Sequence, residues 1–201
     1  GIKGEEVSCP FDKRRNGIIL GEGAVVLAIE SEEHALKRKA RIYATVSSTG
    51  SYFDAYRSGK YQPQAKGLCE SMREAITKAK LNTNDIDYIC SSANSVNKQD
   101  SLETLAIKEV FGKQASKKPI NAIKSMIGET FSASGLFQIA SVVGGFEQKI
   151  IPPTINYCLP DADCDLDYVT NAARKNDAQH VLVTNFGPGG NNATTIISKF
   201  N

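Results

Sequence analysis

The sequence of 201 residues has no tryptophan, only two histidines and no long apolar run. Stretches such as AVVLAI at residues 24–29 are far too short to cross a bilayer, and the first residues show no signal-peptide pattern. An excess of one charge is also lacking, since 24 Lys and Arg face 22 Asp and Glu. We therefore expect a cytoplasmic globular chain that binds neither nucleic acid nor a membrane surface.

Paired cysteines are missing as well. The five cysteines are scattered without a CxxC pair, which suits a reducing compartment better than a disulfide framework or a zinc site. The two histidines, His34 and His180, lie far apart, and neither is near a cysteine in the sequence. We expect His34 on the surface, His180 in a loop and the cysteines as small core residues. We expect no metal and no cofactor.

Strand-like and helix-like segments alternate along the chain. β-branched and apolar runs predict strands, and apolar residues at helical spacing predict helices. The alternation predicts an α/β fold with a mostly parallel sheet and an antiparallel hairpin at the end. The expected strands are 18–30 (broken by a glycine turn), 41–50, 86–92, 119–125, 180–186 and 193–200, and the expected helices are 31–39, 63–79, 100–112 and 133–148.

Local signals place the helix ends. Ser31 is the expected N-cap of the first helix, and Asp100 with Glu103 three residues later resembles a capping box that would start the third. Residues 51–62 show no period and are expected to form a loop. Basic residues at 14–15, 37–39 and 117–118 are expected on the surface, where they could also attract an acidic partner.

The loop SSANSVNKQD, residues 91–100, follows a buried strand. Catalytic groups of α/β proteins usually lie at such strand ends. This loop has no histidine and no glutamate that could act as a base near neutral pH. A site at this position would therefore lack its expected chemistry.

Six stretches of the chain form a pattern. They lie at residues 10–30, 85–89 (with Asp100 and Glu103 downstream), 103–112, 124–135, 151–169 and 186–197. Together they resemble the C-terminal half of a β-ketoacyl-acyl-carrier-protein synthase, a member of the thiolase fold. They follow the family's order and spacing over nearly the whole chain, so the resemblance is strong for the fold. Activity is a separate question, because function belongs to the site.

The resemblance implies a thiolase-like α/β fold in which residues 1–17 form a leading loop and residues 18–201 the C-terminal ketosynthase-like domain. The N-terminal half of the fold is absent from this sequence. Half of such a domain would expose a helix layer and a sheet edge. We therefore expect the N-terminal half as a separate chain, produced by cleavage or by a split gene.

The resemblance also marks the positions of the family's catalytic groups. Two histidines would help to decarboxylate a malonyl thioester, and their positions are taken here by Ser92 and Glu129. Gln138 replaces an acidic residue, Pro188 replaces a gating phenylalanine, and Lys124 is retained. Glu129 either reflects drift at a dead site or pairs with a cation, such as an arginine of a partner or Lys124.

These departures make the chain similar to the chain length factor, the ketosynthase β subunit of type II polyketide synthases. The resemblance implies a subunit without catalytic residues that pairs with an active ketosynthase α subunit, shapes the cavity for the growing polyketide and meets an acyl carrier protein. We expect no activity of the isolated chain, although it belongs to an acyltransferase complex. The alternative is half of a split or atypical synthase or acyltransferase that is itself catalytic.

Overall fold

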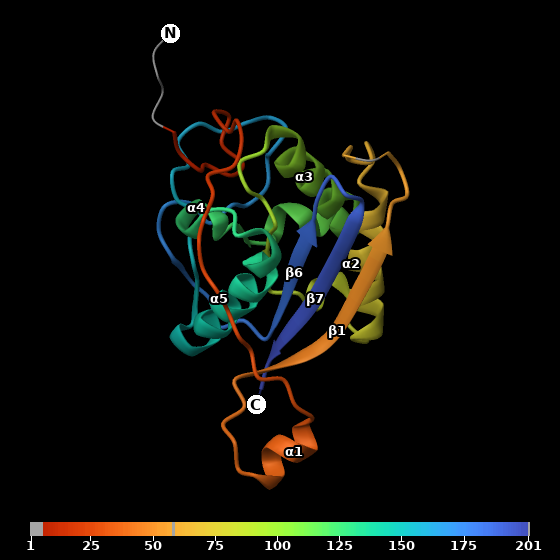
Figure 1. Ribbon diagram of the computed structural model, residues 1–201, viewed down its shortest axis with the longest axis vertical. Helices are drawn as coiled ribbons and strands as arrows, with labels where there is room; N and C mark the ends of the chain where they lie inside the picture. The colour runs from red at the N-terminus through yellow and green to blue at the C-terminus, as the bar shows by residue number, and fades with distance from the viewer. Residues whose placement is uncertain (1–5, 58, 201) are drawn as a thin grey trace.

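The computed structural model describes residues 6–57 and 59–200. Its centre is a five-stranded sheet in the order β1-β7-β6-β2-β3, which Figure 1 shows with its longer strands side by side. The strands are β1 (Ala44–Phe53), β2 (Tyr88–Cys90), β3 (Ile120–Asn121), β6 (His180–Phe186) and β7 (Asn191–Lys199).

Strand directions confirm the expected class. β2 is parallel to β3 and β6, whereas β7 is antiparallel to both of its neighbours, β6 and β1. Every strand of this sheet except β7 therefore runs the same way, and β6 with β7 forms the terminal hairpin. The fold is α/β with a terminal antiparallel hairpin, as the sequence predicts, and the sheet is mixed, with two parallel and two antiparallel strand pairings.

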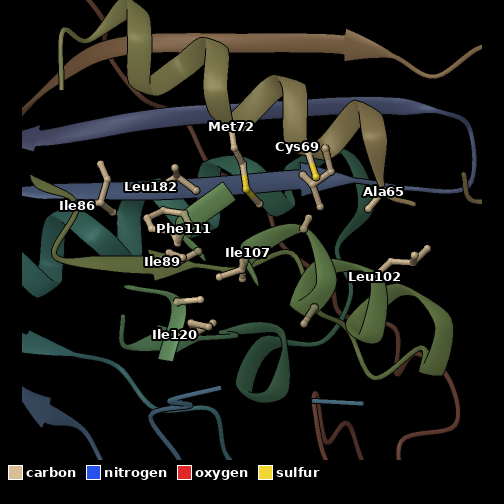
Figure 2. Close-up of a cluster of buried hydrophobic side chains, with 14 of the residues drawn as sticks. Ala65, Cys69, Met72, Ile86, Ile89, Leu102, Ile107, Phe111, Ile120 and Leu182 are labelled. Atoms are coloured by element: carbon tan, nitrogen blue, oxygen red, sulfur yellow. The ribbon is translucent and has the colours of Figure 1, made fainter. Parts of the chain in front are cut away.

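Helices cover both faces of the sheet. α2 (Lys66–Lys78) and α3 (Asn97–Phe111) pack on one face, and α5 (Ser134–Gln148) packs on the other (Figure 1). Side chains of a strand alternate between the faces, so Ile89 points to the first layer and Cys90 to the second. Figure 2 shows the first layer, where residues of α2 and α3 meet those of β2, β3 and β6.

Shorter elements connect these layers. They are α1 (Glu32–Lys37), α4 (Lys124–Ile127), the paired strands β4 (Ile150–Ile151) and β5 (Arg174–Lys175), and three 3₁₀ turns at Thr83–Asp85, Gly112–Lys117 and Phe131–Ala133. Ser31 caps α1 as predicted, through a bond from the backbone N–H of His34 to its hydroxyl. None of the helices within residues 6–57 and 59–200 is long and apolar enough to cross a membrane.

The two strands predicted within residues 18–30 are wrong. Leu20 forms one isolated bridge with Glu129, and residues 21–30 have no strand partner in the described part of the chain. Val26 is 93% exposed and Ile29 is 75% exposed. An apolar run forms a strand only where another strand can bond to it, and the sequence pattern does not reveal whether that strand is present.

The predicted capping box at Asp100 and Glu103 is also wrong. α3 begins earlier, at Asn97, and both carboxylates lie inside it, fully buried. They accept backbone N–H groups from other segments of the chain instead of capping their own helix. The sequence spacing fits a helix cap, but both carboxylates form hydrogen bonds with distant segments of the chain instead.

Several boundaries and environments need smaller corrections. β1 continues to Phe53 into the predicted loop, α2 begins at Lys66 instead of Pro63, and His180 is the first residue of β6. Two basic residues predicted on the surface, Arg15 and Lys118, are buried. Long-range acceptors take their charged ends: Arg15 bonds to Asp161, and Lys118 bonds to backbone oxygens before β2. One predicted core cysteine, Cys158, is exposed.

Candidate functional site

The candidate site lies at the carboxyl ends of β2 and β6, where two loops of the sheet meet the start of α5. Ends of parallel strands share one edge of a sheet, so the loop after Cys90 and the turn after Phe186 are brought to the same side. Ser92, Lys124, Glu129 and Gln138 are all buried there. Pro188 lies in the exposed hairpin turn.

Glu129 is held by four hydrogen bonds. Its Oε2 accepts from Lys124 Nζ and from Asn94 Nδ2, both at 2.9 Å. Its Oε1 accepts from the Phe131 backbone N–H at 2.9 Å and from Ser134 Oγ at 2.6 Å. The expected alternative in which Glu129 pairs with Lys124 is therefore the one that the structure contains.

The electrostatics favour a permanent anion at Glu129. Burial alone would raise the pKa of this carboxyl, but the charge of Lys124 and the bonds from Ser134, Lys124 and Asn94 outweigh burial and lower the pKa. The carboxylate stays ionised near neutral pH, and each of its two oxygens accepts two hydrogen bonds. Such a group is a poor base and has no proton to donate.

Two glycines let the backbone enclose Glu129. Its N–H donates to Ile19 O at 2.8 Å, and Gly21 N–H donates to its carbonyl at 3.0 Å. A Cβ at Gly21 would lie 2.0 Å from Ile127 O, and Gly128 has φ +76° with a Cβ position 2.7 Å from Gly21 N. Only residues without a side chain allow this approach, which fixes residues 19–21 against the end of α4.

Ser92 is held through its backbone as well as its side chain. Its N–H donates to Glu103 Oε1 at 2.9 Å and to Thr184 Oγ1 at 3.2 Å. Gln99 Nε2 donates to the Ser92 carbonyl and hydroxyl at 3.2 and 3.3 Å, while Tyr61 donates to Gln99 Oε1. A serine hydroxyl needs a neighbouring base to become a nucleophile, and its recorded side-chain partner is an amide.

Gln138 joins the two strand ends. Its Nε2 lies 3.2 Å from Cys90 O, 2.7 Å from Ser91 O and 3.2 Å from Thr184 O, and its Oε1 accepts from Asn185. The amide thus links the end of β2 to β6 through bonds to backbone carbonyls. This is a structural role that a carboxylate could not fill, because it has no N–H to donate.

Asp100 and Glu103 are two buried acids at this site that were not among the predicted site residues. Asp100 accepts the N–H groups of Phe11 at 2.9 Å and Asn94 at 3.0 Å, yet burial outweighs these bonds and raises its pKa to about 6. Burial likewise raises the pKa of Glu103 to about 7. The sequence did carry a signal, because both acids share a helix face with Ile107, which belongs to the core.

The structure brings four of the five sequence-selected positions to this region and leaves Pro188 at its exposed rim. Asn94 links Glu129 to the buried Asp100, since its side chain donates to Glu129 and its backbone N–H donates to Asp100. Within the described residues, no group of three or more His, Cys, Asp or Glu side chains is placed to hold a metal ion.

A mixed α/β sheet with one antiparallel strand, helices on both faces and polar loops buried at the carboxyl strand ends defines a thiolase-like domain of the ketosynthase type. Residues 43–158 match the family described as β-ketoacyl synthase, C-terminal domain, and the chain belongs to that family. The fold class and the family resemblance predicted from the sequence are confirmed.

Relatives with assigned names are synthases. The chain is 38% identical over 195 residues to 3-oxoacyl-[acyl-carrier-protein] synthase 2 of Coxiella burnetii. The aligned region covers 97% of this chain and 47% of that protein. It is 34% identical to the tetracenomycin polyketide synthase ketoacyl synthase alpha subunit of Streptomyces glaucescens, over 96% of this chain and 45% of that protein. The chain spans about half the length of these relatives.

Solved structures agree with this assignment. The ishigamide ketosynthase/chain length factor superposes with a TM-score of 0.93 at 35% identity, over 98% of this chain and 48% of that one. A type II polyketide synthase acyl-carrier protein in complex with its ketosynthase bound to the hexaketide gives the same TM-score at 31% identity, over 97% and 48%. The chain is thus similar to the C-terminal half of type II polyketide ketosynthases and related factors.

Proposed function

We propose that this chain is the C-terminal half of a non-catalytic subunit of the chain-length-factor type in a type II polyketide synthase. It pairs with an active ketosynthase, meets an acyl carrier protein and helps to shape the cavity for the growing chain. The N-terminal half of its own fold completes the domain. The observation that carries this proposal is the buried, ionised Glu129, which is bonded to Lys124 at the position where the family resemblance implies a histidine.

The physical argument concerns charge. Decarboxylation of a malonyl thioester creates an enolate, which needs hydrogen-bond donors and no nearby anion. A carboxylate about 4 Å from such a charge costs at least about 1 kcal/mol in water and several times more in a partly dry site. Ser92, at the other implied histidine position, has its backbone N–H turned to Glu103 and an amide as its side-chain partner. Neither residue supports the step.

A catalytic role is the second candidate. It is favoured by the names of the relatives, which include a 3-oxoacyl-[acyl-carrier-protein] synthase and an alpha subunit of a polyketide synthase at 34–38% identity. In that case Lys124 and the buried acids would belong to an atypical active site. The two proposals differ in what happens when Ser92 and Glu129 change.

The test uses the whole subunit, reconstituted with its ketosynthase partner and carrier protein. Ser92→Ala and Glu129→Gln should each leave turnover per intact complex within about threefold of wild type, because the partner ketosynthase is the active subunit. A factor of three corresponds to only about 0.6 kcal/mol of activation free energy. Ser101→Ala, at a partly exposed serine of α3, is the matched control. A fall of a hundredfold or more in either variant, with the complex intact by size exclusion, would favour the catalytic alternative.

A further inference from the structure

Glu103 is a buried glutamate with one bare oxygen. It lies in α3 and has no solvent exposure. Its Oε1 accepts the Ser92 N–H at 2.9 Å and the hydroxyl of Thr184, whereas its Oε2 has no hydrogen-bond partner among the described residues. An ionised carboxylate with a bare oxygen in the interior is much less stable than the neutral acid.

The cation that could neutralise Glu103 is engaged elsewhere. Lys124 Nζ lies 2.9 Å from Glu129 Oε2, and both side chains are at least 93% buried. Glu129 has four donors and Glu103 has two. Lys124 therefore bonds to Glu129, and its charge also acts on Glu103.

The charged groups that act on Glu103 shift its pKa in opposite directions. Asp100, three residues earlier on α3, raises the pKa of Glu103 by charge repulsion, and Lys124 on α4 lowers it. Cys90 on β2 is a further ionisable group that interacts with Glu103, and burial raises the pKa of its thiol to about 12. The thiol is therefore neutral near neutral pH and offers no positive charge.

We propose that Glu103 is a buried proton-binding site that is occupied below neutral pH and emptied above it, and that the bound proton leaves Lys124 free to pair with Glu129. When Glu103 loses the proton, it becomes a second anion that competes for Lys124. The hydrogen bond between Lys124 and Glu129, which helps to hold residues 128–131, is then weakened. This inference does not depend on whether the subunit is catalytic.

The first test is infrared difference spectroscopy of the whole subunit across about pH 5.5 to pH 8.5, a range that brackets the raised pKa. Wild type minus Glu103→Gln should show the carbonyl band of a protonated carboxylic acid at about pH 6, and this band should disappear as the pH rises above about 7. Glu109→Gln, which removes an exposed carboxylate from the same helix, should leave the band in place.

Identical wild-type and Glu103→Gln spectra in the carboxylic-acid region would overturn the proposal. That is also the result expected if a buried water molecule solvates an ionised Glu103. Persistence of the band in Asp100→Asn would show that the proton does not belong to Asp100, whose pKa is also raised.

The second test measures coupling between the two glutamates. Glu129→Gln frees Lys124, so the titration midpoint of Glu103 should fall by about one pH unit or more, a tenfold change in proton affinity. Lys124→Met removes the cation, so the midpoint should rise. An unchanged midpoint in both variants would sink the claim that Lys124 links the two sites, and this readout remains available if Glu103→Gln fails to fold.

Discussion

Glu129 and Glu103 are two buried glutamates that the protein interior treats in opposite ways. The charge of Lys124 and the hydrogen bonds from Ser134, Lys124 and Asn94 lower the pKa of Glu129, whereas burial raises the pKa of Glu103 to about 7. The difference lies in the number of donors that each carboxyl receives from other segments. A glutamate is accommodated at residue 129 because Lys124 and Asn94 donate to its carboxylate.

Removing one partner of the buried pair should be costly. Glu129→Ala leaves Lys124 buried without its counter-charge, so the free energy of unfolding of the whole subunit should fall by about 3–5 kcal/mol in urea titrations. The double variant Glu129→Leu with Lys124→Met should be more stable than Glu129→Ala alone, because no charge is left unpaired.

The control is an exposed pair. Glu70→Ala breaks the surface contact with Arg73, whose side chains are 41% and 43% exposed, and should change stability by no more than about 0.5 kcal/mol. Equal losses for the buried and the exposed pair would contradict the argument that burial makes the Lys124 contact costly to break.

At the scale of elements, two glycines allow residues 19–21 to pack closely against the end of α4. Gly21 and Gly128 let residues 19–21 bond to Glu129 on both sides of its backbone. Neither glycine is unusual in the sequence, and the predicted strand over residues 18–30 missed the contact. The close approach depends on Ile127, more than a hundred residues along the chain, which no local pattern identifies.

Gly21→Ala should therefore destabilise the subunit by about 2 kcal/mol or more, since its Cβ would clash with the Ile127 carbonyl. Faster proteolysis within residues 18–30 would accompany this loss. Gly144→Ala is the matched control, because a Cβ at this position of α5 meets nothing within 4 Å. That helix substitution should leave stability unchanged or raise it by up to about 1 kcal/mol. A Gly21→Ala subunit as stable as wild type would contradict the proposed close contact.

At the scale of the whole molecule, residues 18–30 before α1 expose apolar side chains that no other part of the described chain covers. Residues 18–30 run alongside α4 and α5 to α1, which projects from the body of the domain (Figure 1). Val26 and Ile29 are exposed there without a strand partner among the described residues. The proposal that an N-terminal half completes the fold gives these side chains a surface to cover.

That proposal predicts a specific defect. Val26→Asp with Ile29→Asp should weaken or abolish retention of the N-terminal half, measured by co-purification if it is a separate chain and by protease resistance of the joined halves if it is not. Charged side chains are not accommodated in an apolar contact. Leu105→Asp, which places the same charge at a 45% exposed residue of α3, is the control and should have no such effect. Unchanged association in the double variant would mean that another surface joins the halves.

The sequence by itself determined the α/β class, the core of most strands and helices, the terminal hairpin and the family. These follow from local periodicity and from motifs in fixed order, which do not need distant contacts. Only the tertiary structure decided the environment of the candidate site, where Lys124 bonds to Glu129 and Asp100 and Glu103 are buried instead of capping a helix. The physical reason is that the charge state of a buried carboxyl depends on its donors, and these come from distant segments. Phe11 donates to Asp100, Asn94 to Glu129 and Thr184 to Glu103.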